Sequence, residues 1–128
     1  MGIIIFHAMG KAFSLEFPPY FYLVGIFFSL LPDSDLFLMK SGIIKDHHQF
    51  PSHYPIVIVP ICIMVFLFGF VLSTYPSFWT SVAGLCLLCH YIDDSLGRTT
   101  GIGLRWGMPF GKKYYTFLPW RVLTEEEV

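Results

Sequence analysis

Residues 54–89 read YPIVIVPICIMVFLFGFVLSTYPSFWTSVAGLCLLC, 36 consecutive positions without Asp, Glu, Lys, Arg or His. One membrane-spanning helix needs about 20 apolar residues, so the run is long enough for two. The sequence STYPS at 73–77 carries a turn signal near its middle. We therefore expect two apolar helices, over 54–72 and 77–96, joined by an uncharged turn, with a kink at Pro60.

Two more helices are expected before this run, over 3–14 and 20–31. The second follows Pro18-Pro19 and would be about 18 Å long, which is short for a full membrane crossing. The polar segment 34–52 then serves as a connection, and the glycine-containing tail from Gly97 is expected to form loops and short turns. The predicted fold is a single domain over residues 1–128, a small all-α membrane bundle of about four helices.

The composition supports a membrane protein. Hydrophobic residues make up 55% of the chain and charged residues 13%, about half the usual share in soluble domains. The alternative is a soluble all-α core. The net charge of -1 offers no basic excess for a phosphate backbone, so no nucleic-acid partner is expected. Three cysteines do not form a disulfide framework.

The ionisable residues gather at the ends of the expected helices. If the helices alternate in direction, three groups meet on one face: Asp33 and Asp35; His47, His48 and His53; His90, Asp93 and Asp94. Seven of the eight Lys and Arg residues lie in connections on the same side. Because such a bias marks the cytoplasmic side of a membrane, we expect the cluster to face the cytoplasm of a multi-pass membrane protein.

Histidine and aspartate are ligands of zinc, manganese and non-haem iron. His90 and Asp94 are four residues apart and so share one helix face, while Asp93 is also within reach. His48 and His53 can converge only if Pro51 breaks the helix between them. The sequence therefore predicts a divalent metal site of one or two ions, with Zn²⁺ preferred over Mn²⁺ or Fe²⁺.

These motifs resemble the YdjM-like membrane-bound metal-dependent hydrolases. LLPDSD at 30–35, HQFPSH at 48–53 and HYIDD at 90–94 are similar to that family's L-L-P-D-x-D-H, H-R-G-x-T-H-S and H-x-x-x-D stretches. Residues 101–110 are similar to a glycine-to-L-W-P segment. The sequence departs from the family pattern at Leu36, Gln49 and Tyr54, and Gly107-Met108 is an insertion. Gln49 replaces an arginine that could hold a phosphate, so the departures affect the substrate more than the metal.

The resemblance implies hydrolysis by metal-activated water, with a phosphoester, including a phospholipid, as substrate. The ligands that it implies are His7, Asp33, Asp35, His48, His53, His90 and Asp94. Asp93, next to the matched Asp94, is then the candidate general base or orienting residue. The ligand arrangement is similar to that of the all-α zinc-dependent phospholipases C. The family's name also associates it with the LexA repressor, which implies a protein partner.

Two other interpretations remain open. The chain could be a non-enzymatic membrane protein or partner-binding module, in which a metal only ties the helices together. Cys86, Cys89 and His90 also match the C-x-x-C-H pattern of haem attachment. That pattern would require His90 outside the cytoplasm, and cysteines in an apolar helix usually act as small hydrophobic residues, so we do not expect haem.

Overall fold

The computed structural model describes residues 1–43, 51–72, 74–96, 103–111, 113–117 and 120–124. The described chain is mostly helical, as the sequence predicts. It divides into two compact units. The first comprises Met1–Leu31 and Ile58–Cys89, and the second comprises Pro32–Val57 and His90–Val128. Each unit therefore combines two separate stretches of the chain.

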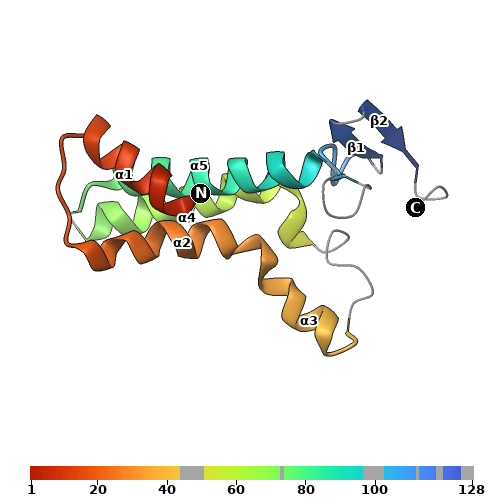
Figure 1. Cartoon of the computed structure of the whole chain (residues 1–128), viewed down its shortest axis with the longest axis horizontal. Coiled ribbons are helices and arrows are strands. Elements are labelled where there is room, and N and C mark those ends of the chain that lie inside the picture. The colour runs from red at the N-terminus through yellow and green to blue at the C-terminus, as the bar shows by residue number, and fades with distance from the viewer. Residues whose placement is uncertain (44–50, 73, 97–102, 112, 118–119, 125–128) are drawn as a thin grey trace. The chain divides into compact units, whose positions relative to one another are not determined.

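Helices α1 (Gly2–Ala12) and α2 (Tyr22–Leu30) lie side by side and antiparallel in the first unit (Figure 1). Their backbones meet at two glycines. A Cβ atom on Gly2 would lie 2.1 Å from the carbonyl oxygen of Gly25, and one on Gly25 would lie 2.4 Å from that of Gly2. Only glycine fits such a close approach. The 3₁₀ turn η1 (Pro19–Phe21) leads directly into α2.

Aromatic side chains form the core of the first unit. Phe6 is 2% exposed and makes an edge contact with Phe78, their ring centroids 5.5 Å apart. Phe17 stacks on Phe78 at 4.9 Å. Cys86 is buried in the same core, so it packs as the small apolar residue that the sequence predicts.

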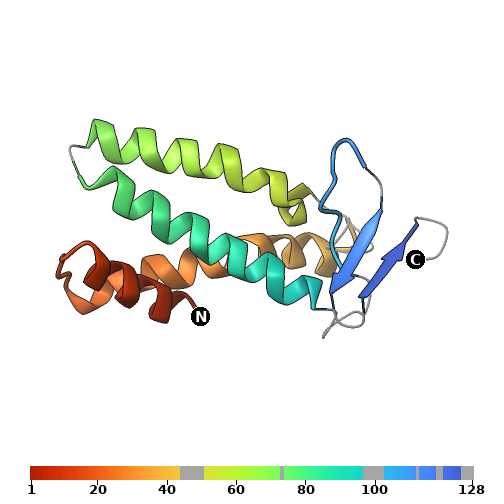
Figure 2. The same cartoon turned by 90° about the horizontal axis from the view of Figure 1, so that it is seen from above.

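Helices α4 (Ile58–Val71) and α5 (Pro76–Ser95) run antiparallel to each other (Figure 2). The regular α-helix begins only at Ile58, so Pro60 lies in its first turn, where a missing N–H disrupts little. Large apolar side chains of α4 project outward. Five of them are 54–67% exposed: Val59, Ile63, Met64, Leu67 and Phe68.

Taken singly, no helix in the described part of the chain combines the length and hydropathy of a membrane crossing. One bent pair of helical segments, Pro19–Leu30 with Pro32–Lys40, meets both criteria by length and composition when counted together.

The second unit is built from short elements. Its first stretch holds the 3₁₀ turns η2 (Pro32–Asp35), η4 (Pro51–His53) and η5 (Pro55–Val57), together with the short helix α3 (Leu36–Lys40). The sequence predicted only a polar connection over 34–52. Its second stretch begins with the last turn of α5. The described residues 32–43 and 51–53 are therefore more helical than expected.

A hairpin follows α5 in the second unit, and it corrects the prediction that the tail holds only loops and turns. Strands β1 (Tyr114–Phe117) and β2 (Trp120–Leu123) pair antiparallel. Leu104 extends the pairing, since its N–H donates to the carbonyl of Tyr115 at 3.2 Å. Gly103 permits this approach with a φ of +77°, because a Cβ there would lie 2.2 Å from the Tyr115 oxygen. Four-residue strands between glycines and prolines give only a weak signal in the sequence.

Candidate metal centre

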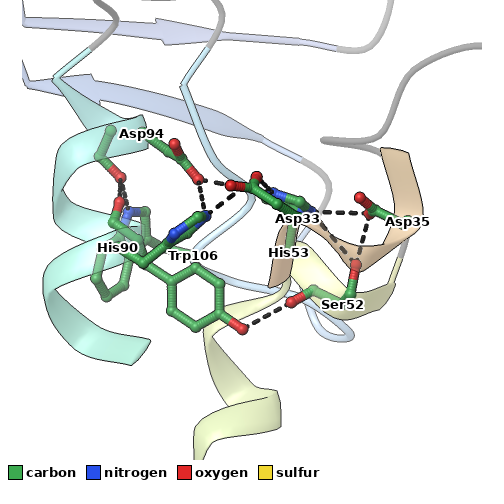
Figure 3. Close-up of polar contacts among 9 residues, drawn as sticks. Asp33, Asp35, Ser52, His53, His90, Asp94 and Trp106 are labelled. Carbon is green, nitrogen blue, oxygen red and sulfur yellow. Dashed lines mark hydrogen bonds and ion pairs between the residues drawn. The ribbon is translucent and has the colours of Figure 1, made fainter. Parts of the chain in front are cut away.

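Four side chains of the second unit point toward one another (Figure 3). Turn η2 provides Asp33, turn η4 provides His53, and the last turn of α5 provides His90 and Asp94. Asp33, His53 and His90 each offer one ligand atom, and these three atoms lie within 4.8 Å of one another. The prediction that the three sequence groups converge is therefore confirmed for these residues.

The distances within this cluster suit a shared metal ion. His53 Nε2 lies 3.7 Å from both Asp33 Oδ1 and Asp94 Oδ2. His90 Nε2 lies 3.5 Å from Asp33 Oδ1 and 3.2 Å from Asp94 Oδ2. Two ligand atoms about 2.0–2.2 Å from a tetrahedral zinc ion are about 3.3–3.6 Å apart. The donor set therefore fits one divalent ion in both chemistry and spacing.

Asp35 contacts the opposite nitrogen of the His53 ring. Its Oδ2 lies 2.9 Å from His53 Nδ1 and accepts a hydrogen bond of 2.6 Å from the Ser52 hydroxyl. Asp35 is 2% exposed and His53 is 0% exposed. A carboxylate that accepts the Nδ1–H of a histidine fixes the tautomer whose Nε2 can bind a metal. The sequence predicts both Asp33 and Asp35 as metal ligands. In the structure Asp33 lies at a ligand position, whereas Asp35 orients His53.

A second hydrogen bond fixes the turn that carries His53. The hydroxyl of Tyr91, on α5, donates to the carbonyl of Ser52 at 2.7 Å. Burial raises the pKa of Tyr91 above its ordinary value of 10, and the charges of Asp94 and Asp35 add to this effect, so the hydroxyl keeps its proton. Tyr91 thus ties η4 to the helix that carries His90.

Trp106 supports the same helix from the tail. Its indole N–H donates to the Ser95 hydroxyl at 2.8 Å, and Ser95 donates to the carbonyl of Tyr91 at 2.7 Å. Ser52, Tyr91 and Ser95 were not among the site residues that the sequence predicts. The only signal for these three was their adjacency to the motif residues, together with the four-residue spacing of Tyr91 and Ser95.

The cluster strongly favours positive charge. Burial disfavours a charged His90, but hydrogen bonds to Asp33 and Asp94 outweigh it and raise the pKa of His90 from 6.5 to about 10. The neighbouring imidazoles of His53 and His90 hold the pKa of Asp33 far below its usual 3.8. The side chain of Asp33 is 33% exposed, so one edge of the cluster is accessible from outside. The cluster can therefore attract a cation, and a cation can reach it from outside through the exposed edge.

Three predicted site residues lie elsewhere or cannot be placed. His7 belongs to the first unit, where its Nδ1 lies 2.9 Å from the Tyr22 hydroxyl. His48 lies outside the described residues. Asp93 is exposed, and it takes part in none of the contacts given above. Metal ligation by His7 and His48 and a catalytic role for Asp93 therefore stay predictions.

No family model, curated protein or solved structure matches this chain. The resemblance to the YdjM-like hydrolases consequently depends on the sequence motifs alone.

Proposed function

We propose that this protein is a membrane-bound, metal-dependent hydrolase of phosphoesters. The observation that carries the proposal is the convergence of Asp33, His53 and His90 from three separate stretches of chain, at the spacing of metal ligands. The buried contact between Asp35 and His53 adds to it, because metal-binding histidines almost always have such a partner.

The exposed edge of the cluster favours catalysis over a purely structural role. Catalytic zinc sites use three protein ligands and keep a fourth position open. When bound, a divalent ion would supply Lewis-acid activation of water and of a phosphoryl oxygen. Asp33, His53 and His90 would hold the ion, and Asp35 would keep His53 in the required tautomer.

Asp94 is the side chain best placed to accept a proton. Its Oδ2 lies 3.2 Å from His90 Nε2 and 3.7 Å from His53 Nε2, so it borders the position that both histidines face. It is also largely but not fully buried, with 17% of its side chain exposed. We therefore move the role of general base from the exposed Asp93 to Asp94.

The membrane location and the phosphoester substrate have separate support. The apolar side chains of α4 are exposed around an uncharged helix, and a helix that is apolar on all sides suits a lipid environment. The bias of Lys and Arg supports a cytoplasmic position for the metal cluster, and the resemblance to the YdjM-like hydrolases implies the inner membrane. A phosphoester is the substrate class that the resemblance to the YdjM-like hydrolases implies, and a divalent ion would polarise its phosphoryl oxygen.

One observation favours a second function, a membrane protein with a structural metal site or a partner-binding role. Asp94 lies as close to the two histidines as Asp33 does. If Asp94 were a fourth ligand, the site would be closed like that of a structural zinc protein.

A pair of neighbouring variants separates the two functions. We expect Asp94→Asn to keep its metal, measured by plasma mass spectrometry, and to lose turnover of bis(4-nitrophenyl) phosphate. Asp93→Asn is the matched control, because it makes the same change at an exposed neighbour, and it should retain both. Loss of metal from Asp94→Asn, with no metal-dependent turnover in the wild type, would favour the structural function. Loss of turnover in Asp93→Asn alone would restore the role first predicted for Asp93.

A further inference from the structure

The first unit contains a pocket of about 540 Å³ that is separate from the metal cluster. It lies among α1, the segment that follows it and the start of α2. Its volume is within the range of small-molecule sites, about 300–1,000 Å³. The lining residues that matter here are His7, Lys11, Ser14, Glu16, Phe17 and Tyr22.

Hydrogen-bonding groups enter this pocket from both helices. His7 and Lys11 are four residues apart and so lie on one face of α1. His7 Nδ1 lies 2.9 Å from the Tyr22 hydroxyl, and the two rings are stacked with an interplanar angle of 22°. Tyr22 therefore positions the imidazole, and no described residue makes a hydrogen bond or ion pair with its Nε2.

Ser14 adds a hydroxyl at a strained position. Helix α1 ends with the N–H of Leu15 donating to the carbonyl of Gly10 at 2.8 Å and that of Ser14 donating to Lys11 at 3.1 Å. This helix ending needs a left-handed residue and favours glycine. Ser14 adopts it with a φ of 54°. The Ser14 hydroxyl thus lines the pocket at a position where glycine would suit the backbone better.

The charges around the pocket are balanced. Lys11 and Glu16 are both exposed, and neither has an ion-pair partner among the residues that the structure describes. A simple anion would be attracted by Lys11 and repelled by Glu16. A ligand that carries one negative and one positive group satisfies both. Lys11, Ser14 and His7, whose Nδ1 already pairs with the Tyr22 hydroxyl, offer several donors that suit the multiple oxygens of a phosphate group.

We infer that this pocket binds a zwitterionic phosphate ester that carries an amine, as in phosphoethanolamine or the same group on a lipid. Lys11, with the neighbouring hydroxyl and imidazole groups, holds the phosphate, and Glu16 holds the amine. The pocket shares no residue with the metal cluster, so this inference goes beyond the proposed hydrolase activity and can be tested separately from it.

Titration calorimetry of the detergent-solubilised full chain tests the ligand chemistry. We expect phosphoethanolamine to bind about tenfold or more tightly than either inorganic phosphate or ethanolamine, because each of these lacks one charge-assisted hydrogen bond. The His53→Ala variant should bind phosphoethanolamine like the wild type. Equal affinity for the three probes, no binding of phosphoethanolamine, or loss of its binding in His53→Ala would overturn the inference.

Single-residue variants test whether Lys11 binds the phosphate and Glu16 binds the amine. Lys11→Gln should weaken phosphoethanolamine and phosphate about tenfold, whereas Glu16→Gln should weaken phosphoethanolamine and leave phosphate equal or tighter. Lys40→Gln, at an exposed lysine of α3, is the matched control and should change neither. Ser14→Gly should weaken phosphoethanolamine while raising the melting temperature, a combination that damage to the fold cannot produce. An unchanged affinity in Lys11→Gln or Glu16→Gln would refute the assignment.

Binding measurements in nanodiscs distinguish a lipid headgroup from a soluble ester as the source of the phosphoethanolamine group. If the ligand is a lipid headgroup, phosphatidylethanolamine in the disc should compete with free phosphoethanolamine and raise its apparent Kd, relative to discs of phosphatidylglycerol. If the ligand is the soluble ester, the two discs should give the same Kd. His7→Ala should weaken the probe and leave the metal content unchanged. If His7→Ala instead lost its metal, His7 would be a metal ligand, as first predicted, and its role in this pocket would be refuted.

Discussion

The two units are stabilised by different kinds of interior. In the first unit the buried side chains are apolar, with Phe6, Phe78, Val82, Ala83, Cys86 and Leu87 at 0–2% exposure. The buried polar side chains of the described residues all lie in the second unit, and they are Asp35, His53, Ser95 and Thr116. The first interior is held by apolar packing, whereas the second combines buried apolar side chains, such as Leu104 and Tyr114, with the hydrogen bonds of Asp35, His53 and Ser95.

This difference predicts that substitutions in the two units affect different properties of the protein. In a close-packed apolar core, a loss of side-chain volume destabilises the fold, but no apolar atom requires one particular partner. A buried polar network requires each member, because a partner removed leaves a desolvated group behind. Substitutions in the first unit should therefore change the free energy of unfolding, and those in the second unit should change metal binding and turnover.

The largest effect is expected at the buried histidine of the second unit. His53→Ala removes a proposed ligand, so metal content should fall to background and phosphodiester turnover should fall by more than the roughly 100-fold typical of an orienting residue. Metal analysis and a rate assay on the purified protein measure both. His7→Ala is the control from the first unit, and it should keep its metal. Equal metal content in wild type and His53→Ala would contradict the site.

The next largest effect tests the aromatic interior. Phe6→Ala should lower the free energy of unfolding by about 3–5 kcal/mol, because it leaves a cavity among Phe17, Phe78 and Trp79. Chemical denaturation followed by circular dichroism measures this change. The folded fraction should retain the metal content of the wild type. A metal-free but otherwise stable Phe6→Ala protein would show that the two interiors cannot be separated.

A smaller effect is expected at the orienting carboxylate. Asp35→Asn should lower metal affinity about 10–100-fold, because the amide is a weaker acceptor for His53 Nδ1 and loses the negative charge. Competition with a fluorescent zinc chelator measures the affinity. Thr116→Val, at another buried polar residue of the second unit, is the comparison and should leave metal affinity unchanged. An Asp35→Asn protein with wild-type affinity would remove Asp35 from the site.

The smallest effect returns to the end of α1. Ser14→Gly should raise the free energy of unfolding by up to about 1 kcal/mol, because glycine adopts the left-handed conformation with less strain, although it also loses more backbone entropy. Thermal unfolding measures the shift. Ser41→Gly, at an exposed serine with a φ of -81°, should be neutral or destabilising. A destabilised Ser14→Gly protein would mean that the hydroxyl contributes more than the backbone strain costs.

The sequence predicts those parts of the site that follow from regular geometry. His90 and Asp94 are four residues apart on a helix, so their contact can be derived from spacing alone. The separate roles of Asp33 and Asp35 cannot, because they depend on how the 3₁₀ turn η2 lies against η4. The position of His7 depends on the close crossing of α1 and α2 at Gly2 and Gly25, which no motif encodes. The hairpin was missed because cross-strand pairing is not visible in four residues of sequence.

The order in which the ligands occur along the chain has a consequence during protein synthesis. His90 follows His53 by 37 residues, and ribosomes add about 5–20 residues per second, so Asp33 and His53 exist for about 2–7 s before His90 is made. Through that interval the nascent chain offers only part of the donor set, which binds metal ions weakly and exchanges them. Under the proposed function, stable metal loading therefore waits until His90 has been made.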